Sequence, residues 1–264
     1  MSNMKHVERS GAGVLTGALA LTLSLVCTVT QASSLKEAHP RELTDMIAFS
    51  TSETLSVRQQ SIVPIAALAA SGDLTRLNVA LNQALDSGLT VSDAKEVLVQ
   101  LYAYAGFPRS LNALNELMNV VEERKQRGIQ DVAGNAPSRA IPRGEELLAA
   151  GTANQTRLLG GPVAGPIFEF APAIDEYLKT HLFGDIFERD NLDWQSRELA
   201  TVSMLSVLPG AEPQLQAHMR ISMNVGLTEG QLRQVSDVLT RRVDADSGGR
   251  VMEALLQTLP AEKK

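Results

Sequence analysis

Apolar residues along this chain recur every three or four positions instead of alternating with polar ones. In the first half they form three stripes, over Ile62–Ala69, Leu74–Leu85 and Val97–Ala105. This spacing places them on one face of a helix, which an amphipathic helix buries against its neighbours. Valine and isoleucine are scattered among Ala, Leu, Gln and Glu without the alternation of a strand. The pattern predicts an all-α protein.

A short pattern that ends one helix and starts the next occurs twice in the chain. Gly88–Thr90 combines a residue suited to ending a helix with one suited to starting the next, and Asp93 stands three residues after Thr90. Gly226–Thr228 repeats the pattern 138 residues later, followed by Gln231. With a one-residue gap, apolar positions also correspond: Ile62, Ile65 and Leu68 match Leu199, Val202 and Leu205. We interpret this as a diverged internal duplication, the alternative being a coincidence of common helix signals.

The duplication and the composition of the segments around it suggest four parts. We expect a signal peptide over 1–32, a first module over 33–128, a connector over 129–166 and a second module over 167–264, with the repeats themselves near 54–127 and 190–258. The connector is rich in Gly, Pro, Asn and Arg, and we expect a short helix over Glu145–Ala150 and a loop over Leu158–Pro162. It is too apolar for a free linker, so we expect it to wrap onto the modules.

The N-terminal segment has the layout of an export signal. Lys5 and Arg9 precede an uncharged stretch over Gly11–Thr30, and Thr30-Gln31-Ala32 offers small residues for cleavage. We predict cleavage after Ala32, an exported protein that is periplasmic or secreted, and no stable membrane insertion afterwards. An uncleaved anchor is the alternative, because the uncharged stretch approaches the length of a short membrane span.

The amino-acid composition excludes several kinds of binding partner and reactive site. The 264 residues are 44% hydrophobic and 20% charged, enough for one large or two small folded domains. A net charge of −6 disfavours a nucleic-acid partner. Cys27 is the sole cysteine, so a disulfide within the chain, a CxxC pair and a cysteine-based zinc site are all excluded. Histidine spacings typical of metal sites are absent as well, and we expect neither a metal nor a cofactor.

Motifs in both halves carry a family resemblance. They are Gly88-Leu-Thr, Glu96-Val-Leu-Val-Gln100 and Tyr104-Ala-Gly-Phe-Pro108 in the first module, and Arg197-Glu-Leu-Ala-Thr201, Gln214-Leu-Gln-Ala-His218 and Asn224-Val-Gly-Leu-Thr228 in the second. Together they resemble the carboxymuconolactone decarboxylase family, which is similar in fold to alkylhydroperoxidase-like helical proteins. The resemblance implies two such helical modules, assembly into a homo-oligomer by trimer or hexamer formation, and sites between helices.

The chain departs from the family pattern in two ways. The peroxidase branch uses a CxxC pair beside a Glu and a His, and without a thiolate no such peroxide reduction can occur here. Each module is also incomplete, because Ala80 stands where the second has His218 and Gln234 stands where the first has Glu96. The halves are complementary, so we expect one composite site that combines Glu96 with His218.

The catalytic candidates are His218, Glu96 and Tyr104. Imidazole suits proton transfer near neutral pH, although a lone histidine on a partly apolar helix face is more often structural. Burial would raise the pKa of Glu96 and suit it to acid–base work, whereas an outward position would make it an ordinary solvated residue. Tyr104 and Tyr102 occupy adjacent helix faces, so at most one of them should line a given pocket.

The substrate-binding candidates are Arg197, Glu198 and Arg109. Arg197 could bind a substrate carboxylate through two hydrogen bonds, and Arg109 could place a cation at a pocket mouth. Adjacent residues point to different helix faces, so Arg197 and Glu198 should serve different surroundings. Surface charge or an interhelical salt bridge is the alternative for this pair, and solvent exposure is the simpler interpretation of Arg109.

The implied activity is cofactor-free decarboxylation or isomerisation of a small carboxylated lactone or related acid. Arg197 would orient the acid, Glu96 and Tyr104 would stabilise the developing charge, and His218 would protonate carbon. The alternative is a non-catalytic exported helical protein, either a small-ligand binder or an oligomeric scaffold.

Overall fold

The computed structural model describes residues 53–260, and within them it contains eleven α-helices, one π-helix and no strand. The prediction of an all-α protein is confirmed. The first module consists of α2 (Val57–Ser71), α3 (Leu74–Asp86), α4 (Val91–Gln100) and α5 (Tyr102–Gln126). The second consists of α9 (Trp194–Ser206), α10 (Glu212–Asn224), α11 (Glu229–Arg242) and α12 (Ala245–Thr258). Between them lie α6 (Glu145–Leu159), α7 (Pro166–Phe170), α8 (Pro172–Tyr177) and the π-helix η1 (Leu178–Ile186).

The internal duplication is visible in the order of the helices and in their caps. Helices α2 to α5 correspond in order to α9 to α12. Thr90 and Thr228 each form a capping box with the residue three positions on, at the starts of α4 and α11. Gly88 and Gly226 precede them with φ of 86° and 96°, a backbone region that favours glycine. The two modules predicted from the sequence are therefore present.

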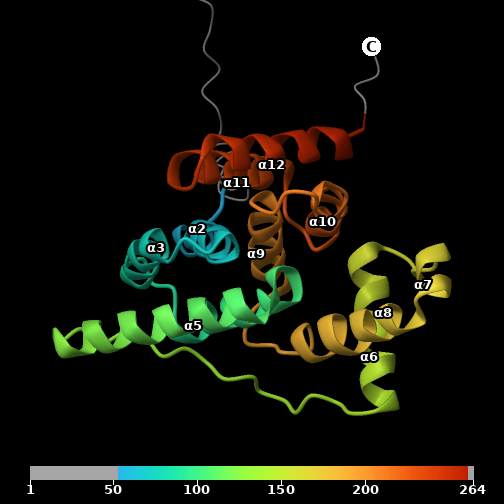
Figure 1. The fold of residues 1–264 in the computed structure, drawn as a ribbon, viewed down its shortest axis with the longest axis horizontal. Coiled ribbons are helices and arrows are strands. Elements are labelled where there is room, and N and C mark those ends of the chain that lie inside the picture. Colours follow the sequence, from blue (N-terminus) through green and yellow to red (C-terminus); the bar gives the residue numbers. More distant parts are fainter. Residues whose placement is uncertain (1–52, 261–264) are drawn as a thin grey trace, which may run out of the picture. The chain divides into compact units, whose positions relative to one another are not determined.

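Helices α2 and α9 pack against each other at the centre of the fold (Figure 1). Nearly every residue of α9 and of the second half of α2 is buried, because these helices are surrounded on all sides. One continuous apolar cluster includes residues of both modules, among them Ile62, Leu98, Leu199 and Leu239. The two repeats therefore share one core.

Helix α5 contains a break close to its start. Gly106 has φ of 81° and ψ of 160°, which are not helical angles, and Pro108 stands in the turn that follows. Gly106 therefore ends the short first turn, and Pro108 stands where the long part of the helix starts. The break separates the short turn that carries Tyr104 from the long part of α5.

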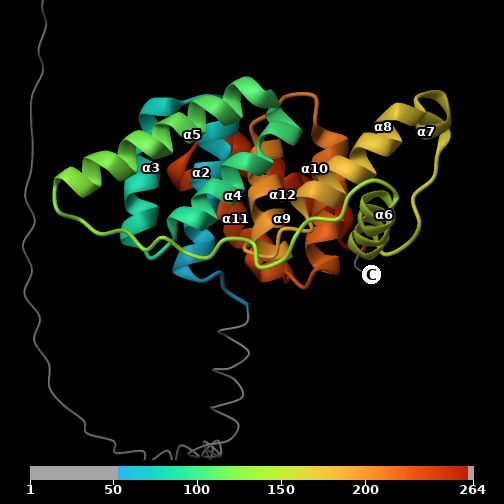
Figure 2. The same cartoon turned by 90° about the horizontal axis from the view of Figure 1, so that it is seen from below.

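The connector wraps onto the first module, as expected from its apolar composition. Its carbonyls at Val132 and Ala133 accept hydrogen bonds from the first two amides of α4, Val91 N (3.0 Å) and Ser92 N (2.9 Å). These amides have no partner within the helix, so the connector supplies one. Figure 2 shows this segment crossing below α4 on its way to α6.

Helix α6 is longer than the sequence analysis expected. It runs to Leu159 and ends at Gly160, so the loop predicted over Leu158–Pro162 begins only after Leu159. Leu158 is fully buried in a second apolar cluster with Phe183, Phe187 and Ile221. That tertiary contact, which the local sequence does not encode, extends the helix.

Among the described helices, none is long and apolar enough to cross a lipid bilayer. The predicted signal peptide over 1–32, Cys27 and His39 lie outside the described residues.

The packing of α6 against η1 depends on Gly151. A Cβ added at Gly151 would lie 1.7 Å from the carbonyl oxygen of Lys179, whereas one added at Gly161 would meet nothing within 4 Å. We expect Gly151→Ala to destabilise this helix pair by about 1–3 kcal/mol through overpacking, and Gly161→Ala to have little effect. Hydrogen exchange of the α6 and η1 amides, together with urea unfolding, measures the difference. Equal protection in both variants would contradict this packing.

Candidate functional site

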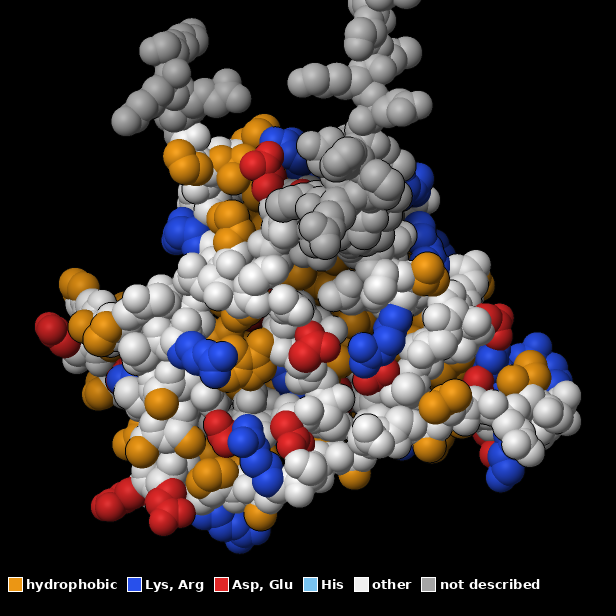
Figure 3. Space-filling view, turned by 180° about the vertical axis from the view of Figure 1, so that it is seen from behind, with side chains coloured by type: hydrophobic (Ala, Val, Ile, Leu, Met, Phe, Trp, Pro, Cys, Tyr) orange, Lys and Arg blue, Asp and Glu red, His pale blue; other side chains and the backbone are white. Residues whose placement is uncertain are grey.

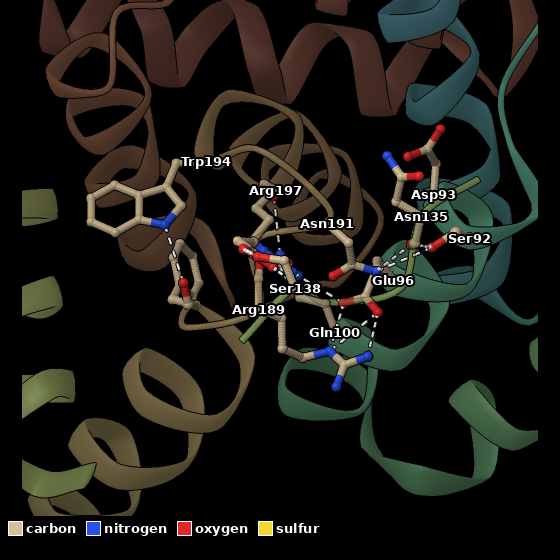
Figure 4. A network of polar contacts seen from close by, with 12 residues as sticks. Ser92, Asp93, Glu96, Gln100, Asn135, Ser138, Arg189, Asn191, Trp194 and Arg197 are labelled. Atoms are coloured by element: carbon tan, nitrogen blue, oxygen red, sulfur yellow. Dashed lines mark hydrogen bonds and ion pairs between the residues drawn. The ribbon is translucent and has the colours of Figure 1, made fainter. Parts of the chain in front are cut away.

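A buried ion-pair network joins the two modules. Arg189 binds both oxygens of the Glu96 carboxylate through one edge of its guanidinium, with Nη2 2.6 Å from Oε1 and Nε 2.9 Å from Oε2. Arg197 Nη2 adds a hydrogen bond of 3.0 Å to Glu96 Oε2. Figure 4 shows the Glu96 carboxylate, from α4, facing guanidinium groups that come from the loop before α9 and from α9 itself. The carboxylate therefore has two cationic partners.

Arg197 is fully buried and is hydrogen-bonded through both of its Nη atoms. Its side chain is 0% exposed, and Nη2 also donates to the carbonyl of Arg189 at 2.9 Å. Gln100 accepts from Arg197 Nη1 at 3.3 Å and donates to Thr201 Oγ1 at 2.7 Å. A buried guanidinium needs such partners because burial removes its hydration. Arg197 therefore binds the protein's own carboxylate, and the expectation that it would be free to bind a substrate carboxylate is wrong.

The expectation for the pKa of Glu96 also needs correction. Glu96 is buried, and burial alone opposes its ionisation. The hydrogen bonds and charges of Arg189 and Arg197 outweigh that effect and hold the pKa of Glu96 below its ordinary value. Glu96 therefore stays ionised at neutral pH and cannot act as the neutral acid that burial alone would have produced.

His218 pairs with Glu198 instead of Glu96. Its Nδ1 lies 2.7 Å from Glu198 Oε2, with α10 supplying the imidazole and α9 the carboxylate. The Glu198 side chain is 0% exposed and that of His218 is 11% exposed. An ionised carboxylate can only accept hydrogen bonds, so Nδ1 carries the proton and Nε2 is left to accept one. Glu198, which the sequence analysis assigned to substrate binding, thus orients the histidine.

Tyr104 completes this second group. Its ring meets the His218 ring edge to face, with centroids 5.7 Å apart. Its hydroxyl is buried beside Glu198 and Thr201 without a hydrogen bond of ordinary geometry. Burial raises the pKa of Tyr104, and the Glu198 charge raises it further, so the phenol stays protonated and available as a donor.

The composite site is therefore built differently from the one expected. The first module contributes Tyr104 to the histidine of the second, while Glu96 serves the arginines. Arg197 and Glu198 do point to different surroundings, as adjacency on a helix requires, one toward α4 and the other toward α10. The dyad of Glu198 and His218 with Tyr104 is the candidate site, and the Glu96 network lies on the other side of α9.

Arg109 is not part of either group. Its guanidinium donates to the carbonyl of Ala70 in the last turn of α2. A cation there satisfies a carbonyl that the helix leaves unpaired and lies at the negative end of the helix dipole. This contact gives Arg109 a structural role.

The Glu96 network borders a groove of about 450 Å³. Its walls are α4, the connector over 133–137, and Arg189 with Asn191. His218 is not among the residues that line this groove. A ligand in it would therefore contact the arginine network and not the imidazole.

The network has an uncharged counterpart, formed by Gln60 of the first module and Gln234 of the second. Gln60 and Gln234 occupy the positions that correspond to Arg197 and Glu96 in the other repeat. Both bind the backbone of Leu55, Gln60 Nε2 donating to its carbonyl at 2.8 Å and Gln234 Oε1 accepting from its amide at 2.7 Å. Ser61 and Ala80 correspond to Glu198 and His218, so the first module has no dyad.

The sequence analysis missed one residue of the Glu96 network and one residue beside the dyad. Arg189 lies in the loop before α9, outside every motif that was considered. Ser222 follows His218 by four residues, which puts both on one face of α10, and its Oγ is buried without a protein partner among the described residues. Only the helical spacing of Ser222 could have indicated it. Within residues 53–260, no group of three or more His, Cys, Asp or Glu side chains gathers as a metal site.

The Glu96 network makes a pH-dependent contribution to stability. We expect Glu96→Gln to cost about 3 kcal/mol at pH 7, because it leaves buried Arg197 without its counter-charge. The pKa of Glu96 is lower in the folded than in the unfolded protein, so its contribution is complete above the unfolded value of about 4.3 and is lost as pH falls through the folded value.

Urea unfolding of both proteins between pH 7 and pH 3 measures this contribution. The difference in unfolding free energy between wild type and Glu96→Gln should stay constant down to about pH 5 and shrink below about pH 4. A difference that grows on acidification would contradict the assignment.

Comparison with known proteins identifies the fold and the two modules. No curated protein matches the chain significantly. The carboxymuconolactone decarboxylase family matches it twice, over residues 39–117 and 172–258, so that both repeats are covered and together make up more than half of the chain. The chain belongs to the carboxymuconolactone decarboxylase family.

Proposed function

We propose that the protein catalyses cofactor-free decarboxylation or isomerisation of a small carboxylated lactone or related acid. The observation that supports this most directly is the buried His218–Glu198 dyad with Tyr104 against the imidazole. Membership of the family adds a decarboxylase precedent for the scaffold. The reaction needs no redox chemistry, which fits a chain without a CxxC pair.

Decarboxylation assigns a role to each of the three groups. When the bond to the carboxylate breaks, carbon dioxide leaves and the electron pair enters the neighbouring double bond of the unsaturated acid. Tyr104 donates a hydrogen bond to the oxygen on which negative charge develops. His218 takes up a proton from solvent at Nε2, which gives an imidazolium that Glu198 stabilises, and then delivers that proton to carbon. The acid loses carbon dioxide and gains one proton in its place.

Three buried polar atoms support a polar ligand at this site. Tyr104 Oη, Glu198 Oε1 and Ser222 Oγ have no protein partner among the described residues. Buried polar atoms are nearly always hydrogen-bonded, so a bound molecule or an ordered water would satisfy these three. Tyr104 also packs against the apolar cluster that contains Leu158 and Ile221. Such a wall favours loss of a carboxylate as neutral carbon dioxide.

The second candidate function is a non-catalytic oligomeric scaffold. Exposed apolar side chains on α5, α7 and α8 favour it, since soluble proteins seldom leave such groups grouped on their surface. The two functions separate cleanly in experiment, because a scaffold would tolerate replacement of His218 and an enzyme would not.

The first test is the release of carbon dioxide from carboxymuconolactone and related unsaturated lactone acids. We expect His218→Gln to lower kcat/KM at least 100-fold, because glutamine can hydrogen-bond Glu198 but cannot transfer a proton. Tyr104→Phe should lower it by about 100-fold through loss of one donor. His181→Gln is the matched control, since that histidine is exposed on η1. Wild-type turnover by His218→Gln would reject the proposed mechanism.

We also propose that the chain is exported. Its basic start, uncharged stretch and small residues before Ser33 support this. N-terminal sequencing of protein recovered from the exporting cell's extracytoplasmic fraction should begin at Ser33. A protein that retains Lys5 and fractionates with membranes would favour an uncleaved anchor instead.

A further inference from the structure

The tip formed by α7 and α8 is an apolar surface without a partner within the described protein. None of its residues is buried. Ile167, Phe170, Ile174 and Tyr177 are 58%, 87%, 45% and 62% exposed. Ile167 and Phe170 are three residues apart in α7, and Ile174 and Tyr177 are three residues apart in α8, so each pair lies on one side of its own helix. In Figure 3, hydrophobic side chains gather on this projecting tip at the left edge of the view.

A second apolar surface lies along α5. Phe107, Leu111 and Met118 are 60%, 61% and 61% exposed, and half-buried Leu114 and Val121 continue the stripe at alternating steps of four and three residues. This spacing is the heptad pattern with which helices pack against another helix. Beside it, between α4 and α5, lies a groove of about 450 Å³ lined mostly by apolar side chains, with Lys95 and Glu122 among its polar lining residues.

The charges on the tip and in the groove indicate whether a tip would contact a groove or a second tip. The tip carries Glu169, Asp175 and Glu176; Lys179, at the start of η1, pairs with Asp175 at 2.5 Å, and the other two carboxylates make no ion pair with a described residue. Two tips in contact would therefore repel each other. The groove carries one charge of each sign, Glu122 and Lys95, and Lys95 is exposed and makes no ion pair with another described residue. An acidic apolar tip thus fits the groove better than it fits a second tip.

The two surfaces cannot meet within one chain. Figures 1 and 2 both show α7 and α8 at the opposite end of the described helices from the C-terminal half of α5. A tip can therefore reach a groove only on another molecule. Contact between different patches of two copies is heterologous, and it builds either a closed ring or an open chain.

We propose that the α7–α8 tip of one copy inserts into the α4–α5 groove of a second copy of this chain. Phe170 is the main anchor, because an aromatic side chain that is 87% exposed gains most from burial. Met118 forms part of the receiving wall. The acidic residues of the tip approach Lys95. This contact is independent of the chemistry proposed for His218.

The test uses one substitution on each surface, Phe170→Asp on the tip and Met118→Asp in the groove. Both residues are exposed, so neither change should disturb folding. Sedimentation velocity of the purified protein should show an assembly for wild type and at least a 10-fold weaker one for each variant. Leu256→Asp, at an apolar residue that is 55% exposed on α12, is the control and should assemble like wild type.

Mixing the two variants provides the decisive measurement. Met118→Asp retains an intact tip and Phe170→Asp an intact groove, so an equimolar mixture should form a heterodimer that neither variant forms alone. A wild type that is monomeric, a Phe170→Asp variant that assembles normally, or a mixture that stays monomeric would each overturn the proposal. Normal assembly by Phe170→Asp would indicate pairing of two α5 stripes.

Discussion

The buried contact between Arg197 and Glu96 is the constraint on which the rest of this structure depends. It joins α9 of the second repeat to α4 of the first across the centre of the core. Two buried charges are costly unless they are paired and hydrogen-bonded, and here Arg189, Gln100 and the carbonyl of Arg189 supply further partners. The result fixes the rotation of α9 about its own axis.

That rotation in turn positions the candidate chemistry. Because Arg197 faces α4, its neighbour Glu198 must face α10, where it holds His218 by Nδ1. The break at Gly106 then brings Tyr104 from the first module onto the imidazole. The three groups come from three helices that are rigidly packed, which suits a site where a shift of about 1 Å can impair catalysis.

The duplication diverged in a way that electrostatics explains. A buried charge that loses its partner is strongly destabilising, so charged partners tend to be kept or lost together. One pair of corresponding positions holds the charged residues Arg197 and Glu96. The equivalent pair of positions holds two neutral amides, Gln60 and Gln234, which bind backbone groups instead. The dyad follows the same rule, since its counterpart positions hold neither charge.

The sequence by itself determined the all-helical fold, the repeat and the candidate residues His218 and Tyr104, because helical periodicity and caps are local properties. It could not decide which partners the charged residues would find. Burial alone predicted a raised pKa for Glu96, but Arg189, which comes from a loop 93 residues away, reverses the shift. Pairing across helices depends on packing angles and helix rotation, and these are set only when the whole core forms.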